Sequence, residues 1–470
     1  MPIDEALFHR AFGKKKTIAR LQNSSLPFKP GELPTADQHR AFIQSLFEEV
    51  KSHRYYPEAP RGYIVHNKYK GVARIVPVFT YRDLCVYYFC IKCLEDFIAV
   101  NRVEGTYGGW RLGNPIWRKE HEEQSARGLH QPNPNSQHYH YGAPYGDAGT
   151  YYPARWHQNW GDYQNLANSF SHDFEGEHYI HFDIANFYDT ISLAVLETRV
   201  RSLAPVKEGP IVDLLFHFLR NWNRFNVGYA STNVGIPQDE KSDCSRILAN
   251  LYLQSYDREI YALCNSANRQ ARYLRYTDDQ IIMGRSRAEV RELLYHASIH
   301  LHKLGLNLNS GKVDEIEGRE NFRFHWCFAI FEDLEDTNDS MRIARALEET
   351  TARLENERSQ VQYPSWRKSS IFKRFITIGL DRLDHDSSLQ LVEAILEPDF
   401  LQTLSAEQLG VLSKSLDEDR RVQFFQRVEI LIPEVPHNSF QLAVLSGLSN
   451  HLSSAARQQL QRRALQPIGL

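Results

Sequence analysis

The segment Tyr273–Gly284 constrains the fold of this chain more than any other. Within it, Asp278 and Asp279 stand side by side and interrupt two runs of apolar and aromatic residues that favour β-strands. A turn between two antiparallel strands would hold both carboxylates at one end of a sheet. A divalent cation offsets the repulsion between carboxylates that lie so close. The pattern therefore predicts a metal-binding hairpin, and the alternative is an exposed acidic turn.

A second acidic position lies upstream, where the apolar stretch Tyr179–Phe182 predicts a strand that ends at Asp183. Two-metal phosphoryl transfer needs carboxylates from two neighbouring strands to hold a pair of divalent ions, which activate a 3′-hydroxyl and stabilise the leaving pyrophosphate. We expect Asp183 and Asp278 to be these carboxylates and Asp279 to add negative charge. Asp189 is expected to cap the helix that begins after it, or to be a surface acid.

The order of these segments resembles that of reverse transcriptases over about Tyr63–Phe331. The resemblance implies an α+β right-hand polymerase with fingers, palm and thumb, acting as an RNA-directed DNA polymerase, which is a nucleotidyltransferase. It implies two Mg²⁺ ions, with Mn²⁺ as the alternative, held by Asp183, Ile184, Asp278 and Asp279. The implied partners are dNTPs and RNA and/or DNA.

The same resemblance implies roles for basic residues that bind the incoming triphosphate. The stretch Tyr63–Pro77 resembles the fingers hairpin, with a glycine turn. Arg74 is the first choice there because a planar fork suits bidentate phosphate contacts, while Lys68 and Lys70 would act as point charges or remain solvated. Lys312 resembles the lysine that approaches the β- and γ-phosphates and protonates the leaving group.

Tyr188 occupies the position where this family places an aromatic ring under the sugar. A bulky ring at that spot would clash with a 2′-hydroxyl and so select deoxynucleotides. The alternative is an ordinary core aromatic.

The segment Gly235–Leu253 resembles the one that supports the template base, and the resemblance assigns Pro237, Gln238 and Arg246 to it. It departs from the family pattern because Asp239 replaces a glycine. Glycine lets a backbone approach nucleic acid closely, whereas a carboxylate opposes phosphate. Template handling is therefore expected to differ, unless Arg246 and a neighbouring lysine neutralise the acids.

The serine-arginine pair before an apolar helix, together with a helical tail, resembles bacterial defence-associated, abortive-infection-like reverse transcriptases. That resemblance implies antiviral (antiphage) activity, magnesium dependence, and a noncoding RNA partner or DNA synthesis that is protein-primed or free of a nucleic-acid template. Two alternatives stay open. One is a template-independent transferase with the same palm, and the other is a catalytically dead RNA-binding scaffold.

The chain has 470 residues, 42% of them hydrophobic, which predicts two or three domains. We expect an N-terminal extension over 1–60, then fingers and palm over 61–335 with an insertion at about 120–160. A helical thumb and an α-helical C-terminal domain, compatible with helical repeats, should follow over 336–470. Such a helical surface fits RNA, a second polymerase subunit or further copies of the chain.

Amphipathic patterns predict helices at both ends of the chain, and an aromatic run before the C-terminal region predicts a strand or primer-grip hairpin over Phe322–Trp326. The expected helices are Gln38–Lys51, Leu84–Val100, Arg342–Arg358, Ile371–Leu380, Ser388–Leu396, Ala406–Ser415, Glu418–Leu431, Phe440–Leu448 and Ser453–Leu465.

The charge distribution and the cysteines indicate which partners and which compartment to expect. The net charge is −3, yet residues 1–110 hold 16 Lys/Arg against 11 Asp/Glu, so the catalytic half is basic enough to bind phosphates. The six cysteines show no disulfide framework and no apolar run is long enough to span a bilayer, so we expect a cytoplasmic protein without a membrane partner. Cys90 and Cys93 are expected on one helix face, and His138 and His140 in a loop ordered by a partner, rather than as zinc ligands.

Overall fold

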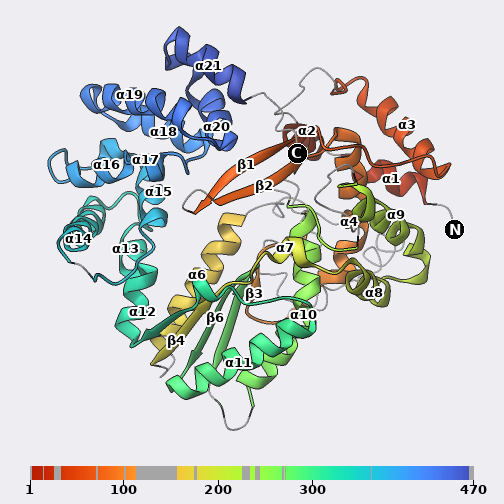
Figure 1. Cartoon of the computed structure of the whole chain (residues 1–470), viewed down its shortest axis with the longest axis horizontal. Helices are drawn as coiled ribbons and strands as arrows, with labels where there is room; N and C mark the ends of the chain where they lie inside the picture. The colour runs from red at the N-terminus through yellow and green to blue at the C-terminus, as the bar shows by residue number, and fades with distance from the viewer. Residues whose placement is uncertain are drawn as a thin grey trace. The chain divides into compact units, whose positions relative to one another are not determined.

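The computed structural model of the chain describes residues 3–13, 15–25, 33–69, 72–99, 102–112, 156–173, 177–224, 233–238, 244–266, 269, 271–360 and 362–464. These residues form two compact units (Figure 1). The first unit holds Met1–Gly62 with Val76–Gly318, and the second holds Tyr63–Ile75 with Arg319–Ile468. Each unit has its own buried apolar core.

A five-stranded sheet forms the centre of the first unit, with the strand order β3-β5-β6-β4-β7 (Figure 1). The strands are β3 (Thr106–Tyr107), β4 (His178–Phe182), β5 (Arg272–Tyr276), β6 (Asp279–Gly284) and β7 (Asp314–Glu317). β3 runs parallel to β5, and every other neighbouring pair in this sheet is antiparallel. β5 and β6 form the hairpin that the sequence predicts.

The first unit also contains a set of helices. They are α1 (Glu5–Ala11), α2 (Lys15–Ser25), α3 (His39–Lys51), α4 (Tyr81–Ala99), α6 (Trp156–Asp173), α7 (Phe187–Thr190), α8 (Leu193–Leu203), η3 (Val206–Glu208), α9 (Gly209–Asn221), α10 (Cys244–Cys264), α11 (Arg287–Lys303) and η4 (Ser310–Lys312). α10 and α11 pack against the sheet and against each other, and α6 packs against β5 and β3. α4 is buried along almost its whole length and contains both Cys90 and Cys93, as predicted.

The second unit contains most of the paired strands β1 (Gly62–Tyr69) and β2 (Val72–Val78), together with a series of helices. These helices are α12 (Arg319–Trp326), α13 (Phe328–Asp333), α14 (Ser340–Ser359), α15 (Lys368–Ile378), η5 (Leu380–Arg382), α16 (Leu389–Ile395), α17 (Pro398–Leu401), α18 (Ala406–Ser415), α19 (Glu418–Glu434), α20 (Asn438–Leu448), η6 (Ser449–His451) and α21 (Ser454–Ala464). The mixed α and β fold with a helical C-terminal region is therefore confirmed.

Local capping explains why the C-terminal helices begin where they do. Asp339 and Asp417 accept hydrogen bonds from backbone N–H groups in the first turns of α14 and α19. Ser405 and Gln408 form a capping box at the start of α18. These caps satisfy N–H groups that short helices would otherwise leave unpaired.

One local prediction is wrong. Phe322–Trp326 is part of helix α12, not a strand, because Phe322 and Trp326 are four residues apart and both turn into the core with no exposed surface. Of the two expectations for Asp189, the surface acid is confirmed, since Asp189 is exposed in α7 and Ser192 caps α8 through a bond from Val195 N–H.

None of the helices among the described residues combines the length and the apolar character needed to cross a bilayer.

Candidate active site

Three carboxylates meet at one end of the sheet in the first unit. The last paired residues of β4 and β6 are Phe182 and Gln280, so Asp183 and Asp279 are the next residues at the same end of these strands. β5 and β6 end at the pair Tyr276 and Asp279, which leaves Thr277 and Asp278 as a two-residue turn. The structure thus brings together the three acids that the sequence singled out.

The turn that carries Asp278 has an unusual backbone. Thr277 has a φ of +53°, a left-handed conformation that a β-branched residue rarely adopts. Its N–H donates to the carbonyl of Tyr107 at 3.3 Å, and its hydroxyl donates to Asp278 Oδ1 at 2.8 Å. Strand β3 and the threonine hydroxyl therefore hold the turn in place.

A buried arginine also holds this turn through a hydrogen bond. Arg275 is fully buried, and its Nε and Nη2 donate to the two oxygens of Asp257 at 2.8 and 2.7 Å. Its Nη1 donates to Asn250 Oδ1 and to the carbonyl of Thr277, both at 2.8 Å. The side-chain amide of Asn250 also donates to the Gly109 carbonyl at 2.8 Å. This network links the turn to helix α10 and to the loop after β3.

Gly108 lies directly against the turn, and this contact leads to a testable prediction. A Cβ at Gly108 would lie 2.5 Å from Thr277 Cγ2 and 3.0 Å from Thr277 N, whereas a Cβ at Gly109 would meet nothing within 4 Å. Both glycines have positive φ, +111° and +93°, so alanine is strained at either position. We expect Gly108→Ala to lower nucleotide incorporation by about tenfold or more, because a displacement of about 1 Å can cost that much.

Gly109→Ala is the matched control for this prediction. It should show a similar loss of thermal stability and should retain most of the activity. Steady-state incorporation assays compare the activity of the two variants, and thermal melts compare their stability. Equal activity in the two variants would show that the close contact with Thr277 is unimportant.

The site carries excess negative charge. Burial, followed by the charges of Asp279 and Asp183, raises the pKa of Asp278 to about 6. Lys312 Nζ donates to Asp183 Oδ2 at 2.8 Å, and Asn309 Nδ2 donates to the same oxygen at 3.3 Å. Burial alone would lower the pKa of Lys312, but the contact with Asp183 and the two other carboxylates raise it overall. One ammonium facing three carboxylates leaves negative charge uncompensated.

This donor set fits divalent cations. Carboxylate oxygens are the ligands that Mg²⁺ and Mn²⁺ prefer, and the uncompensated charge favours a cation. Ile184 has a side chain that is buried in the core, so only its backbone can contribute a ligand. The chemistry of these residues therefore fits a divalent cation, and their assignment as its ligands stays a prediction.

Backbone pairing explains how Lys312 reaches Asp183. The N–H of Ala185 donates to the Asn307 carbonyl at 2.9 Å, and the N–H of Asn309 donates to the Asp183 carbonyl at 2.8 Å. The segment after α11 therefore runs along the chain that leaves β4. The 3₁₀ turn η4 then directs Lys312 back toward the carboxylate.

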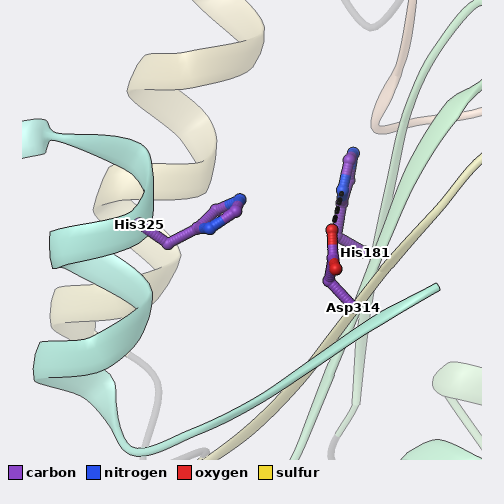
Figure 2. Close-up of side chains that lie close together, drawn as sticks. All are labelled: His181, Asp314 and His325. Carbon is purple, nitrogen blue, oxygen red and sulfur yellow. Dashed lines mark ion pairs between the residues drawn. The ribbon is translucent and has the colours of Figure 1, made fainter. Parts of the chain in front are cut away.

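His181 is a neighbour of the site that the sequence did not reveal. Its Nε2 lies 3.4 Å from Asp279 Oδ1 and its Nδ1 lies 3.7 Å from Asp314 Oδ2, the second pair being drawn in Figure 2. His181 precedes Asp183 by two residues on β4 and therefore points to the same face of the sheet. Contact with the imidazole limits the orientations open to Asp279.

Tyr188 lies beside the segment expected to support the template. Its carbonyl accepts a hydrogen bond from the N–H of Ile236 at 2.9 Å, and its ring is half-buried against the apolar core. Pro237 is buried and Gln238 is half-buried. The structure therefore places the expected sugar gate next to the expected template segment.

The remaining predicted residues lie elsewhere. Arg74 is exposed on β2, and Lys68 belongs to β1, where the structure describes only its backbone. Arg246 is half-buried in α10. Lys70 and Asp239 lie outside the described residues, as does most of the 120–160 insertion, including His138 and His140.

Comparison with known proteins defines the class of this site. Residues 151–326 match the family described as reverse transcriptase (RNA-dependent DNA polymerase), and this range contains Asp183, Asp278 and Asp279. The chain therefore contains a reverse transcriptase domain, the domain of RNA-directed DNA polymerases, which are nucleotidyltransferases. A search of curated proteins found no match.

Solved structures similar to this chain include fungal telomerases. The apo telomerase of Candida tropicalis truncated from its C-terminal domain shares 12% identity, with a TM-score of 0.33 over 55% of this chain and 50% of that chain. The telomerase of Candida albicans in complex with a TWJ fragment of telomeric RNA shares 9% identity, with a TM-score of 0.35 over 92% and 71% of the two chains. This chain thus spans about half the length of the first of these structures.

Proposed function

We propose that this protein synthesises DNA from dNTPs by reverse transcription, with two divalent ions, Mg²⁺ or alternatively Mn²⁺, held by Asp183, Asp278, Asp279 and the backbone of Ile184. The observation that carries the proposal is the convergence of three carboxylates and Lys312 at one end of the β4–β6 pair. Bound divalent ions would supply charge neutralisation of the phosphates and activation of the 3′-hydroxyl.

The residues of the chain contribute binding and proton handling. The Lys312 ammonium carries protons at Nζ next to the carboxylates, where it can contact the β- and γ-phosphates and protonate the leaving group. Tyr188 and Gln238 form the sugar and base side of the site, while Lys68, Lys70 and Arg74 are the cations expected at the triphosphate. Pro237, Asp239 and Arg246 are the expected template contacts.

Incubation of the purified protein with single dNTPs and with all four, before and after ribonuclease treatment, tests this function. RNA-directed synthesis predicts a product that depends on RNA and on a divalent ion. Ribonuclease-resistant synthesis of one fixed product would instead support template-independent or protein-primed synthesis. The absence of synthesis under every condition would support an RNA-binding scaffold.

We further propose a role in bacterial antiphage defence, which the serine-arginine pair and the helical C-terminal region suggest. A noncoding RNA, a second polymerase subunit or further copies of the chain would be the partners. Phage plating on cells that express the wild type or Asp278→Asn tests this role. Equal protection by both proteins would show that defence does not depend on DNA synthesis.

The Tyr188 gate gives a separate prediction. Tyr188→Ala should raise the ratio of ribonucleotide to deoxynucleotide incorporation by roughly 10- to 100-fold, because a clash with the 2′-hydroxyl disappears. Tyr188→Phe keeps the ring and is the control. Matched incorporation assays with dNTP and rNTP measure the ratio, and an unchanged ratio in Tyr188→Ala would identify the tyrosine as a core residue only.

A further inference from the structure

The hairpin β1–β2 belongs to the same compact unit as the C-terminal helices. Tyr63–Ile75 groups with Arg319–Ile468, and β1 lies beside α20 (Figure 1). The two segments are more than 370 residues apart in the chain. The side chain of Asn438, at the start of α20, makes polar contacts between them.

Asn438 binds the edge of β1 with both ends of its amide. Its Oδ1 accepts from the N–H of Val65 at 2.7 Å, and its Nδ2 donates to the carbonyl of Tyr63 at 3.0 Å. Tyr63 and Val65 are alternate residues, so these backbone groups project from one edge of the strand. The amide therefore pairs with β1 much as a neighbouring strand would. Asn438 is only 3% exposed and the two backbone groups are partly buried, so water has limited access to both bonds.

The helix that carries this amide, α20, is held in place by contacts with the rest of the second unit. Phe440 and Val444 anchor α20 in the core of the second unit. Just before the helix, the Val435 carbonyl accepts from the buried side chain of Gln441 at 2.6 Å. Because its helix is packed in this core, Asn438 offers β1 a fixed hydrogen-bonding partner.

We propose that Asn438 is a positioning residue for the incoming nucleotide, acting through β1. The inference rests on the proposed function, in which Lys68 of β1 and Arg74 of β2 contact the triphosphate. A two-stranded hairpin alone is at best marginally stable in water, and charged groups bind well only when their supports are fixed. The C-terminal helices thus set nucleotide affinity through one buried amide.

Substitution of Asn438 tests the proposal. Asn438→Ala leaves two backbone groups of β1 without their partner, and we expect the KM for dNTP to rise about 5- to 20-fold with kcat within about twofold. Asn438→Asp keeps an acceptor for Val65 N–H but turns an acceptor toward the Tyr63 carbonyl, so its KM should rise as well. A general loss of stability would instead reduce kcat through a smaller active fraction.

Asn450→Ala provides the control, since Asn450 is an exposed asparagine in the same unit. It should leave both constants unchanged. Unchanged KM in Asn438→Ala and Asn438→Asp, with normal folding, would overturn the proposal.

Hydrogen exchange on the full-length wild type tests the contact without any variant. Val65 N–H should be protected, and Asn438→Ala should speed its exchange by about tenfold or more, because the donor loses a buried partner. Rapid exchange of Val65 in the wild type would overturn the proposal even if no variant folds. A wild type that makes no DNA while Val65 stays protected would instead contradict the proposed function and leave the contact standing.

Discussion

Asp183→Asn should abolish DNA synthesis while leaving the protein folded. The substitution keeps the size of the side chain but removes one of the carboxylates that would hold the divalent ions. We expect a fall in the single-turnover rate of at least about 10³-fold, which corresponds to roughly 4 kcal/mol in the barrier. Rapid-quench incorporation of a single dNTP measures it.

The thermal stability of Asp183→Asn should rise or stay the same, although its activity falls. The charges of Asp279 and Asp183 both raise the pKa of Asp278, so removing one charge relieves repulsion in the metal-free protein. Lys312 loses its partner but is 48% exposed and can turn to water. Thermal melts in a chelator should therefore give a Tm equal to or above that of the wild type.

Divalent ions and a nearby acid provide the controls for Asp183→Asn. Mg²⁺ should raise the Tm of the wild type by mass action and should raise that of the variant much less. Asp189→Asn changes an exposed acid on α7 and should retain activity. Normal turnover by Asp183→Asn would remove the basis of the two-ion site.

Much of the fold and of the acidic site was accessible from the sequence because periodic patterns are local. The runs of apolar and aromatic residues on either side of Asp278 and Asp279 predicted β5 and β6, and amphipathic stretches predicted the C-terminal helices, with Ala406–Ser415 matching α18 to the residue. Asp183 was found because an acid that ends an apolar strand is a local signal. The roles of these residues in metal binding and catalysis remain predictions.

The supports of the site escaped prediction because their partners are distant in the chain. Gly108 contacts Thr277 because β3 pairs with β5. A strand of two residues, such as β3, is too short to give a recognisable sequence pattern. The contact of Asn438 with β1 has no local signal at all. Arg275 did offer a hint, since a charge inside an apolar strand requires a partner, but the sequence does not say that the partner is Asp257.

Arg275→Leu should destabilise the protein strongly. The substitution removes both guanidinium hydrogen bonds to Asp257, a buried carboxylate that still accepts from the hydroxyl of Tyr273 at 2.9 Å. Breaking a buried ion pair from one side costs roughly 3–5 kcal/mol of the free energy of unfolding. Chemical denaturation measures this loss. Arg291→Leu, which breaks an exposed pair with Glu315, is the control and should change stability little.

The double variant Arg275→Leu/Asp257→Leu separates stability from positioning. Replacing both partners by apolar residues should recover most of the lost free energy of unfolding, because no unpaired charge is left buried. Activity should nevertheless stay at least about tenfold below that of the wild type, because the Thr277 carbonyl has lost its donor and the turn that carries Asp278 is less well held. A double variant with wild-type incorporation would mean that Arg275 and Asp257 only fill the core, whereas one as unstable as Arg275→Leu alone would show that the unpaired carboxylate is not the source of the loss.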